Sequence, residues 1–237
     1  MSIVQIPSVA HCQLWRVDLD VAPGPEASAC LSDEEWERAH RFVFARDRHR
    51  FVAAHSALRG VLSAHTGIPG AFLDFAHGAF GKPRLVEPAG VRFNLSHSQS
   101  VGLIAISMDS EVGIDVELLR HMPDAEALAA NHFTIVEQTA LKNVSPDERD
   151  RAFLRCWTRK EACLKATGLG LSTDTRTFEV GLAGDTREVQ IAGDGSRARL
   201  ALSSFDGGLG IVCAVARILA VESIAPRPMM QESELYA

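Results

Sequence analysis

A dense run of helix signals in the second half of the sequence constrains the fold more than any other feature. Ser145, Pro146 and Glu148 supply an N-cap, a proline at the first helical position and a glutamate at the third. Gly168 ends the pattern where a left-handed residue is favoured. Between these limits, apolar residues recur at helical spacing: Phe153, Cys156, Trp157 and Leu164. The pattern predicts a long helix over 146–167 with one face in a core.

The polar side of this helix carries a carboxylate and an ammonium one turn apart. Trp157, Glu161 and Lys165 step by four residues along one stripe, and Lys160 flanks Glu161. A solvated Glu–Lys pair of this kind contributes about 0.3–0.5 kcal/mol and needs no function. The alternative is that the pair belongs to a site. We expect Trp157 to lie in the core rather than in that site.

Helix and strand signals occur twice in the same order along the chain. In the first series, Ser32 and Glu35 form a capping box before one helix, and a second helix is expected over 47–65. Strands are expected at 14–19, 72–75, 84–86, 91–95, 101–107 and 112–117, and Asp109-Ser110 is expected to turn the last two into a hairpin.

The second series repeats this plan. Helices are expected at 124–131, 134–142 and 146–167, with a capping box of Thr134 and Glu137, and strands at 177–182, 188–192, 197–204 and 209–218. The predicted fold class is α+β, with two pseudo-symmetric halves at 1–118 and 119–221 and a tail at 222–237. Two such halves pack as a pseudo-dimer around a cleft, which is a common position for a ligand. We therefore expect a monomer.

Composition disfavours several classes of function. The formal charge of −6 argues against nucleic-acid binding, whereas the arginines between 38 and 50 form a local basic patch suited to a small polyanion. The 5 cysteines form no C-x-x-C pair, which indicates a reduced, cytoplasmic protein without structural zinc. The longest apolar run, 209–221, contains Arg217 and is too short to span a membrane.

An acidic pair lies in the strand expected at 112–117. Asp115 and Glu117 are two residues apart, so their carboxylates share a face, with Cα atoms about 6.5–7 Å apart. Two carboxylates this close raise one pKa unless a cation lies between them. Together with Glu161 they offer three hard oxygen ligands, a set that suits Mg²⁺ or Mn²⁺. The alternative is the solvated face of an edge hairpin.

Three other polar segments have the chemistry to contact phosphate. Ser96 and His97 end a strand and can donate hydrogen bonds. A Ser–His nucleophilic pair is a competing interpretation, although adjacent residues on an extended chain point apart; turn capping by the serine is another. Lys82 is presented by Gly81-Lys82-Pro83, which alone resembles a surface turn. Arg50 can bind a phosphate bidentately or lie on a solvated helix face.

Three motifs follow one another along the chain: FNLSHS at 93–98, VGIDVE at 112–117 and WTRKEACLK at 157–165. The ordered set resembles the 4′-phosphopantetheinyl transferases of the long, surfactin-synthetase-activating type, over about residues 31–216. The resemblance implies two α+β halves with the active site in the cleft between them. It also implies transfer of 4′-phosphopantetheine from coenzyme A to a serine of an apo acyl or peptidyl carrier protein. Fatty acid, polyketide, nonribosomal peptide and siderophore synthesis all use such carriers.

The resemblance also assigns roles to residues. The implied Mg²⁺ ligands are Asp115, Glu117 and Glu161. The implied catalytic residues are Asp115, Glu161 as general base (directly or through water) and Lys165, which neutralises the β-phosphate or protonates the leaving group. The implied coenzyme A site contains Arg50 at the 3′-phosphate, Lys82 and Pro83 beside the adenine nucleotide, Ser96 nearby, His97 at the pyrophosphate, and Lys160 and Lys165. A noncatalytic coenzyme A-binding module and a Mg²⁺-dependent phosphohydrolase remain alternatives.

Overall fold

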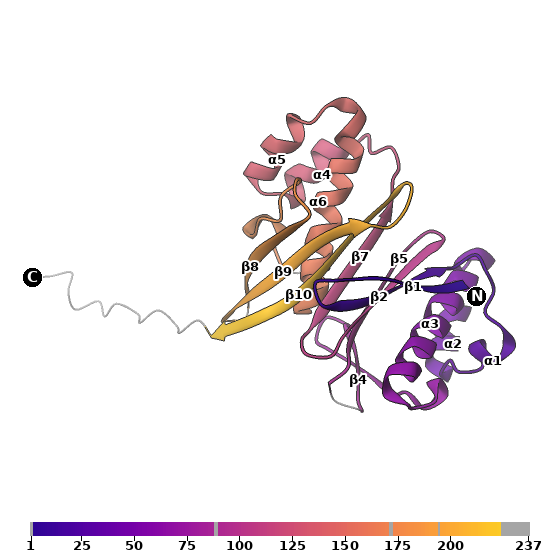
Figure 1. The fold of residues 1–237 in the computed structure, drawn as a ribbon. Helices are drawn as coiled ribbons and strands as arrows, with labels where there is room; N and C mark the ends of the chain where they lie inside the picture. The colour runs from indigo at the N-terminus through magenta and orange to yellow at the C-terminus, as the bar shows by residue number, and fades with distance from the viewer. Residues whose placement is uncertain (1, 88–89, 171–172, 194, 224–237) are drawn as a thin grey trace, which may run out of the picture.

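The computed structural model of the chain describes residues 2–87, 90–170, 173–193 and 195–223. These residues form two halves, each with a four-stranded antiparallel sheet and helices packed against it (Figure 1). The predicted α+β fold class is therefore confirmed. Residues 224–237, most of the predicted tail, lie outside the described residues. Among the described helices, none combines the length and the hydropathy needed to cross a bilayer.

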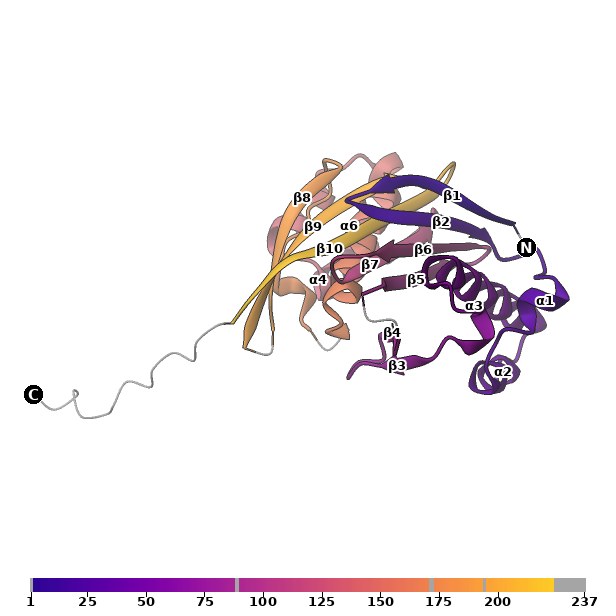
Figure 2. The same ribbon diagram turned by 60° about the horizontal axis from the view of Figure 1, so that its bottom comes forward.

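The first sheet has the strand order β1-β2-β6-β5, and a separate two-stranded ribbon pairs β3 with β4. The elements of this half are β1 (Ser2–Val9), β2 (Cys12–Asp18), α1 (Pro25–Ser28), α2 (Asp33–His40), α3 (Ala45–Thr66), a 3-10 turn (Gly70–Phe72), β3 (Phe75–His77), β4 (Pro83–Leu85), β5 (Arg92–Ser98) and β6 (Val101–Ser107). The predicted capping box opens α2, because Ser32 and Glu35 each accept a hydrogen bond from the other's backbone amide. α3 packs on β5 and β6 (Figure 2).

The second sheet has the order β7-β10-β9-β8. Its half contains β7 (Val112–Leu118), α4 (Ala125–His132), α5 (Ile135–Lys142), α6 (Pro146–Thr167), a 3-10 turn (Thr175–Thr177), β8 (Thr186–Gly193), β9 (Ser196–Asp206) and β10 (Ile211–Ser223). The helix predicted over 146–167 is confirmed, with Gly168 at φ 70° as its left-handed end. The Ser145 side chain makes no capping hydrogen bond, so Pro146 and the acidic first turn start α6 without it.

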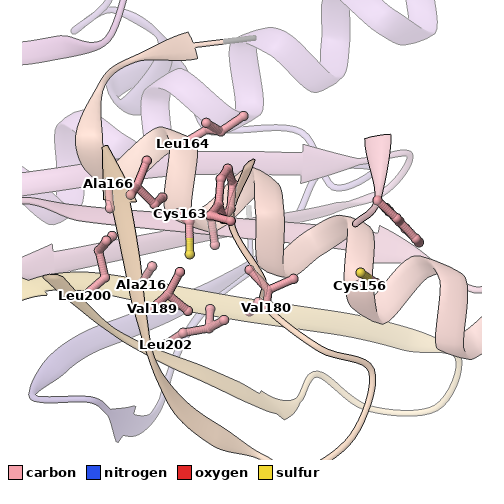
Figure 3. Packing of buried hydrophobic residues seen from close by; sticks show 14 of the residues in the cluster. Cys156, Cys163, Leu164, Ala166, Val180, Val189, Leu200, Leu202 and Ala216 are labelled. Carbon is pink, nitrogen blue, oxygen red and sulfur yellow. The ribbon is translucent and has the colours of Figure 1, made fainter. Parts of the chain in front are cut away.

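α6 is the centre of the second core. Cys163 projects from it among residues of the sheet such as Leu200 and Ala216 (Figure 3). Burial raises the pKa of Cys163 to about 12, so this thiol acts as an apolar group. A further core between the two sheets includes Leu14, Ile114 and Val215. This core holds the halves together.

The predicted hairpin between 101–107 and 112–117 is wrong. β6 pairs with β2 and β5, whereas β7 pairs with β10 in the other sheet. Residues 108–111 therefore carry the chain from one sheet to the other. Turn residues such as Asp109-Ser110 indicate where the chain reverses, but they do not determine which strand becomes the partner. The division into 1–118 and 119–221 stays a prediction; by strand pairing alone, β7 belongs to the second sheet.

Residues 178–182, expected to lie in a strand, are irregular. Here side chains, rather than a neighbouring strand, form hydrogen bonds with the backbone amides and carbonyls. The Arg159 guanidinium donates to the carbonyls of Val180 and Gly181, and the Glu137 carboxylate accepts from the amides of the same two residues. This pairing of charged side chains with backbone is not visible in a strand-like sequence pattern.

Two other differences concern the first half. The strand expected at 72–75 begins only at Phe75, because residues 70–72 form a 3-10 turn. β1 has no counterpart among the predicted strands. Most of its side chains are exposed or only partly buried, and Pro7 interrupts its pattern, so the alternation that identifies a half-buried strand is weak there.

Candidate functional site

The site forms where α6 crosses β7. Gly113 lies at the crossing, and a Cβ on it would clash with the carbonyl oxygen of Ala162 and the amide nitrogen of Ala166. Glycine is therefore required for the helix backbone to lie this close to the strand. Because Glu161 and Lys165 lie on this part of α6, the close crossing brings both toward the acidic residues of β7.

Asp115 and Lys165 form the centre of the site. Nζ of Lys165 lies 2.6 Å from Oδ1 of Asp115 and 3.0 Å from Oγ of Ser96, and the serine hydroxyl donates to the same carboxylate oxygen at 2.9 Å. Asp115 is only 6% exposed. Burial raises the pKa of Asp115, and the Lys165 ammonium offsets only part of that rise. Ser96 is thus part of this buried cluster rather than a free donor for a nucleotide.

Glu161 lies one turn before Lys165 on α6. Burial raises the pKa of its carboxyl group, and the carboxylates of Asp115 and Glu117 raise it further. Glu161 and Lys165 line a cavity of about 190 Å³ together with Phe80, Gly81, Lys82, Asn94, Leu164, Gly168 and Gly170. A carboxylate with a raised pKa in a cavity has the properties of a general base.

Glu117 lies near the end of β7. Its Oε2 accepts hydrogen bonds from Ser98 at 2.8 Å and from Arg120 at 2.7 Å. Asn94 on β5 accepts from a β7 backbone amide at 2.9 Å. β5 and β7 belong to different sheets, so polar side chains join these two strands. The sequence analysis did not predict these contacts between β5 and β7. The available signal was that Asn94, Ser96 and Ser98 alternate along β5, as Asp115 and Glu117 do along β7.

The three carboxylates have the donor chemistry for a divalent cation. Asp115, Glu117 and Glu161 offer hard oxygens. Burial raises the pKa of Asp115 and of Glu161, so a positive charge beside these two carboxylates would stabilise their ionised forms. In the part of the chain that the structure describes, no three His, Cys, Asp or Glu side chains already stand as metal ligands. Lys165 and Arg120 are the present counter-ions of Asp115 and Glu117. A metal ion bound there would share these carboxylates with the two basic side chains.

His97 is exposed near the end of β5, among basic residues. Desolvation lowers the pKa of its imidazole, and the charges of Lys165, Arg38 and Arg50 lower it further. Arg50 on α3 binds Asp20 bidentately, with Nε 2.7 Å from Oδ1 and Nη2 3.1 Å from Oδ2. Basic side chains from Lys165 on α6 to Arg50 on α3 thus act on His97. A carboxylate holds the arginine that the family resemblance assigns to a phosphate.

A second cavity, of about 340 Å³, lies between α2, α3 and the β3–β4 ribbon, and its lining includes Arg38, His55 and Pro83. Nδ1 of His55 lies 2.9 Å from Oε1 of Glu35, and Nε of Arg59 donates to Oε2 of the same carboxylate at 2.7 Å. Burial opposes ionisation of Glu35, but hydrogen bonds from His55 and the backbone and the charge of Arg59 lower its pKa to about 2. Sequence reasoning identified Glu35 only as a helix cap.

Lys82 lies at the edge of the smaller cavity, but its ammonium is bound by the second half. Nζ donates to Oε2 of Glu111 at 2.6 Å and to the carbonyls of Val112 at 3.0 Å and Ala166 at 3.1 Å. Burial lowers the pKa of Lys82, and Glu111 opposes that effect. The resemblance places Lys82 beside the adenine nucleotide, whereas here its charged end joins β7 to α6.

Lys160 points away from the site, so its placement at coenzyme A was wrong. It is 1% exposed, its Nζ lies 2.8 Å from Oε2 of Glu137, and it donates to the carbonyls of Thr175 and Phe178, both at 2.8 Å. Successive residues of a helix are about 100° apart around its axis. Lys160 therefore faces the second core, while Glu161 faces β7.

The fold and the site together define a class of protein: an α+β enzyme with a buried acid–lysine cluster suited to a phosphate-containing substrate. The chain matches the model of the 4′-phosphopantetheinyl transferase superfamily over residues 111–216. It matches the N-terminal 4′-phosphopantetheinyl transferase model over residues 25–109. The chain belongs to the 4′-phosphopantetheinyl transferase superfamily.

Two relatives illustrate the similarity. The chain is 38% identical over 164 residues to the 4′-phosphopantetheinyl transferase HetI of Nostoc sp., which covers 67% of this chain and 69% of HetI. It is 30% identical over 156 residues to the 4′-phosphopantetheinyl transferase Sfp of Bacillus subtilis, which covers 65% of this chain and 68% of Sfp. These matches agree with the resemblance drawn from the three motifs.

Proposed function

We propose that the protein transfers the 4′-phosphopantetheine group of coenzyme A to a serine of an apo acyl or peptidyl carrier protein. The serine oxygen bonds to the phosphorus of that group, the pyrophosphate bond breaks, and adenosine 3′,5′-bisphosphate leaves. The observation that carries the proposal is the buried Asp115–Lys165 pair, with Glu161 beside it, at the junction of the two halves. The transferase names of HetI and Sfp agree with it.

Mg²⁺, or Mn²⁺ in its place, would be held by Asp115, Glu117 and Glu161. When bound, the ion neutralises charge on the pyrophosphate as it is cleaved. The chain's own cations have a related task. Lys165 neutralises the β-phosphate or protonates the leaving oxygen, and its contact with Asp115 holds its ammonium in the site.

Glu161 accepts the proton of the attacking serine. It lines the same cavity as Lys165, one turn away on α6, which suits the two groups to one proton-transfer step. Glu161 and Lys165 therefore act on opposite sides of one step: the first on the attacking oxygen and the second on the leaving oxygen.

Coenzyme A binds along the junction. Its nucleotide occupies the cavity lined by Arg38, His55 and Pro83, and its pyrophosphate lies between His97 and Lys165. Arg50 binds the 3′-phosphate by exchanging the Asp20 carboxylate for a phosphate, which offers the same bidentate geometry and more charge.

We further propose that the protein works as a monomer, because its two halves supply both sides of the site. All five cysteines are free, as expected for a protein of the reducing cytoplasm. Sedimentation velocity at working concentration tests the proposed monomer: a monomer mass supports it, and a dimer mass contradicts it.

The function is tested by incubating the protein with coenzyme A, Mg²⁺ and a panel of apo carrier proteins, followed by intact-mass measurement of each carrier. We expect at least one carrier to gain one phosphopantetheine group, together with an equal amount of adenosine 3′,5′-bisphosphate. Coenzyme A cleavage without a carrier adduct would indicate a phosphohydrolase. Coenzyme A binding without cleavage would indicate a binding module.

A further inference from the structure

Glu111 has no role in the proposed reaction, yet it lies at the contact between the two halves. Its Oε2 is 2.6 Å from Nζ of Lys82, and its Oε1 is 3.1 Å from Nε of Arg92. Its backbone carbonyl accepts from the amide of Ile218 on β10, which fixes the residue at the start of β7. One carboxylate at the entry to β7 therefore holds two cations of the first half.

The Lys82 ammonium continues this contact onto α6. Besides Glu111, it binds the carbonyl of Ala166, one of the last carbonyls of the helix, and the carbonyl of Val112. The last four carbonyls of a helix have no partner within it, and a lysine at this end is favoured by the helix dipole. We call Lys82, Glu111 and these two carbonyls the Lys82 clamp.

The clamp is directly connected to the catalytic cluster. Ala166 follows Lys165 in sequence, and Val112 lies on β7 with Asp115. At this crossing Gly113 leaves no space between helix and strand, so a fixed last turn of α6 determines where Lys165 lies. The Lys82 side chain is 15% exposed, and its ammonium already has three acceptors. It is therefore poorly placed to bind a phosphate.

We infer that Glu111 is a positioning residue for the transfer reaction: it holds Lys82 across the junction, and the clamp sets the distance between Lys165 and Asp115. This inference rests on the proposed function for its kinetic test. It differs from the assignment of Lys82 to the adenine nucleotide, because a positioning role affects turnover and a binding role affects the affinity for coenzyme A.

The kinetic test compares Glu111→Gln, Lys82→Met and the double variant with wild type, and uses Glu87→Gln, an exposed carboxylate just after the ribbon, as the matched control. We expect kcat for carrier loading to fall about tenfold in Glu111→Gln and more in Lys82→Met, because small displacements of catalytic groups are costly. The KM for coenzyme A should stay within about twofold of wild type. The double variant should be no slower than Lys82→Met, and Glu87→Gln should match wild type.

Hydrogen exchange measured by mass spectrometry gives a readout that needs no activity. In Glu111→Gln we expect faster exchange of the amides in the last turn of α6, with exchange at α3 unchanged. A raised KM for coenzyme A with unchanged kcat in Lys82→Met would overturn the inference, and so would wild-type kinetics in Glu111→Gln. If wild type loads no carrier, the proposed function fails, and the exchange result alone decides on the clamp: unchanged exchange in Glu111→Gln overturns it.

Discussion

The ammonium of Lys165 lies 2.6 Å from Oδ1 of Asp115 and so joins the last turn of α6 to the middle of β7. The lysine side chain is 29% exposed and the aspartate side chain 8%. The pair is thus open to a ligand on the lysine side and closed on the aspartate side. This arrangement lets one cation compensate a buried carboxylate while it remains within reach of a substrate phosphate.

The first prediction concerns Asp115 and the metal. Asp115→Asn should lower carrier loading by orders of magnitude, and excess Mg²⁺ should not restore it, because the variant lacks a hard anionic ligand. Since burial raises the pKa of Asp115, its charge does not favour folding, and the thermal midpoint should change by only a few degrees. Wild-type activity should vanish in EDTA and return with Mg²⁺ or Mn²⁺. Undiminished loading by Asp115→Asn would remove the metal site from the mechanism.

A second prediction separates binding from chemistry at Arg50. Arg50→Ala should mainly raise the KM for coenzyme A, because the 3′-phosphate is remote from the bond that breaks. The variant should use 3′-dephospho-coenzyme A nearly as well as coenzyme A, whereas wild type should prefer coenzyme A. Equal use of the two substrates by wild type would show that Arg50 serves only Asp20, its partner in the structure.

Gly113 provides a prediction about packing. Gly113→Ala should lower the free energy of unfolding by at least about 2 kcal/mol, because the added Cβ meets helix backbone that cannot rotate away. The matched control is Gly60→Ala on α3, where a Cβ meets nothing within 4 Å. That substitution should raise stability by about 0.5–1 kcal/mol. Urea titrations of both variants check the contrast, and equal stabilities would contradict the close crossing of α6 and β7.

These contacts show what the sequence made predictable and what it did not. The bounds of α6 follow from local signals, a proline at its start and a glycine at its end, and the spacing of Asp115 and Glu117 gives their shared face. The partners of these groups are distant in sequence. Ser96 reaches Asp115 from another sheet, and no local pattern encodes which strands of two sheets come together.

Lys160 and Glu161 illustrate a second limit. Both are charged, adjacent and part of one motif, so sequence proximity placed both in the site. The helix turns them to different sides, and only Glu137, Thr175 and Phe178, which surround the lysine ammonium, show that its side faces the second core. The available signal was that Lys160 lies on the apolar side of an amphipathic helix. A charged residue in that position requires buried partners.

Glu35 leads to a prediction about pH. Its pKa falls from 4.5 to about 2 in the folded chain, so the ionised carboxylate stabilises the fold above about pH 4.5, and that contribution is lost as the pH falls toward 2. Between pH 6 and pH 3, the difference in unfolding free energy between wild type and Glu35→Gln should shrink, by on the order of 1–2 kcal/mol.

Glu26→Gln, which removes an exposed carboxylate outside this cluster, is the control for this comparison. Denaturant titrations at several pH values measure both differences. A difference for Glu35→Gln that is independent of pH would mean that His55 and Arg59 do not hold the carboxylate in its charged form.

The central claim is that Glu161 and Lys165 act on the transfer step rather than as a surface pair. Their removal should therefore lower kcat far more than stability. The most direct test is single-turnover loading of an apo carrier by Glu161→Gln, by Lys165→Gln and by the double variant, read by intact mass. We predict that each single variant is at least about a hundredfold slower than wild type, that thermal midpoints stay within a few degrees, and that the double variant loses much less than the product of the single effects. Near-wild-type rates in both single variants would contradict the account.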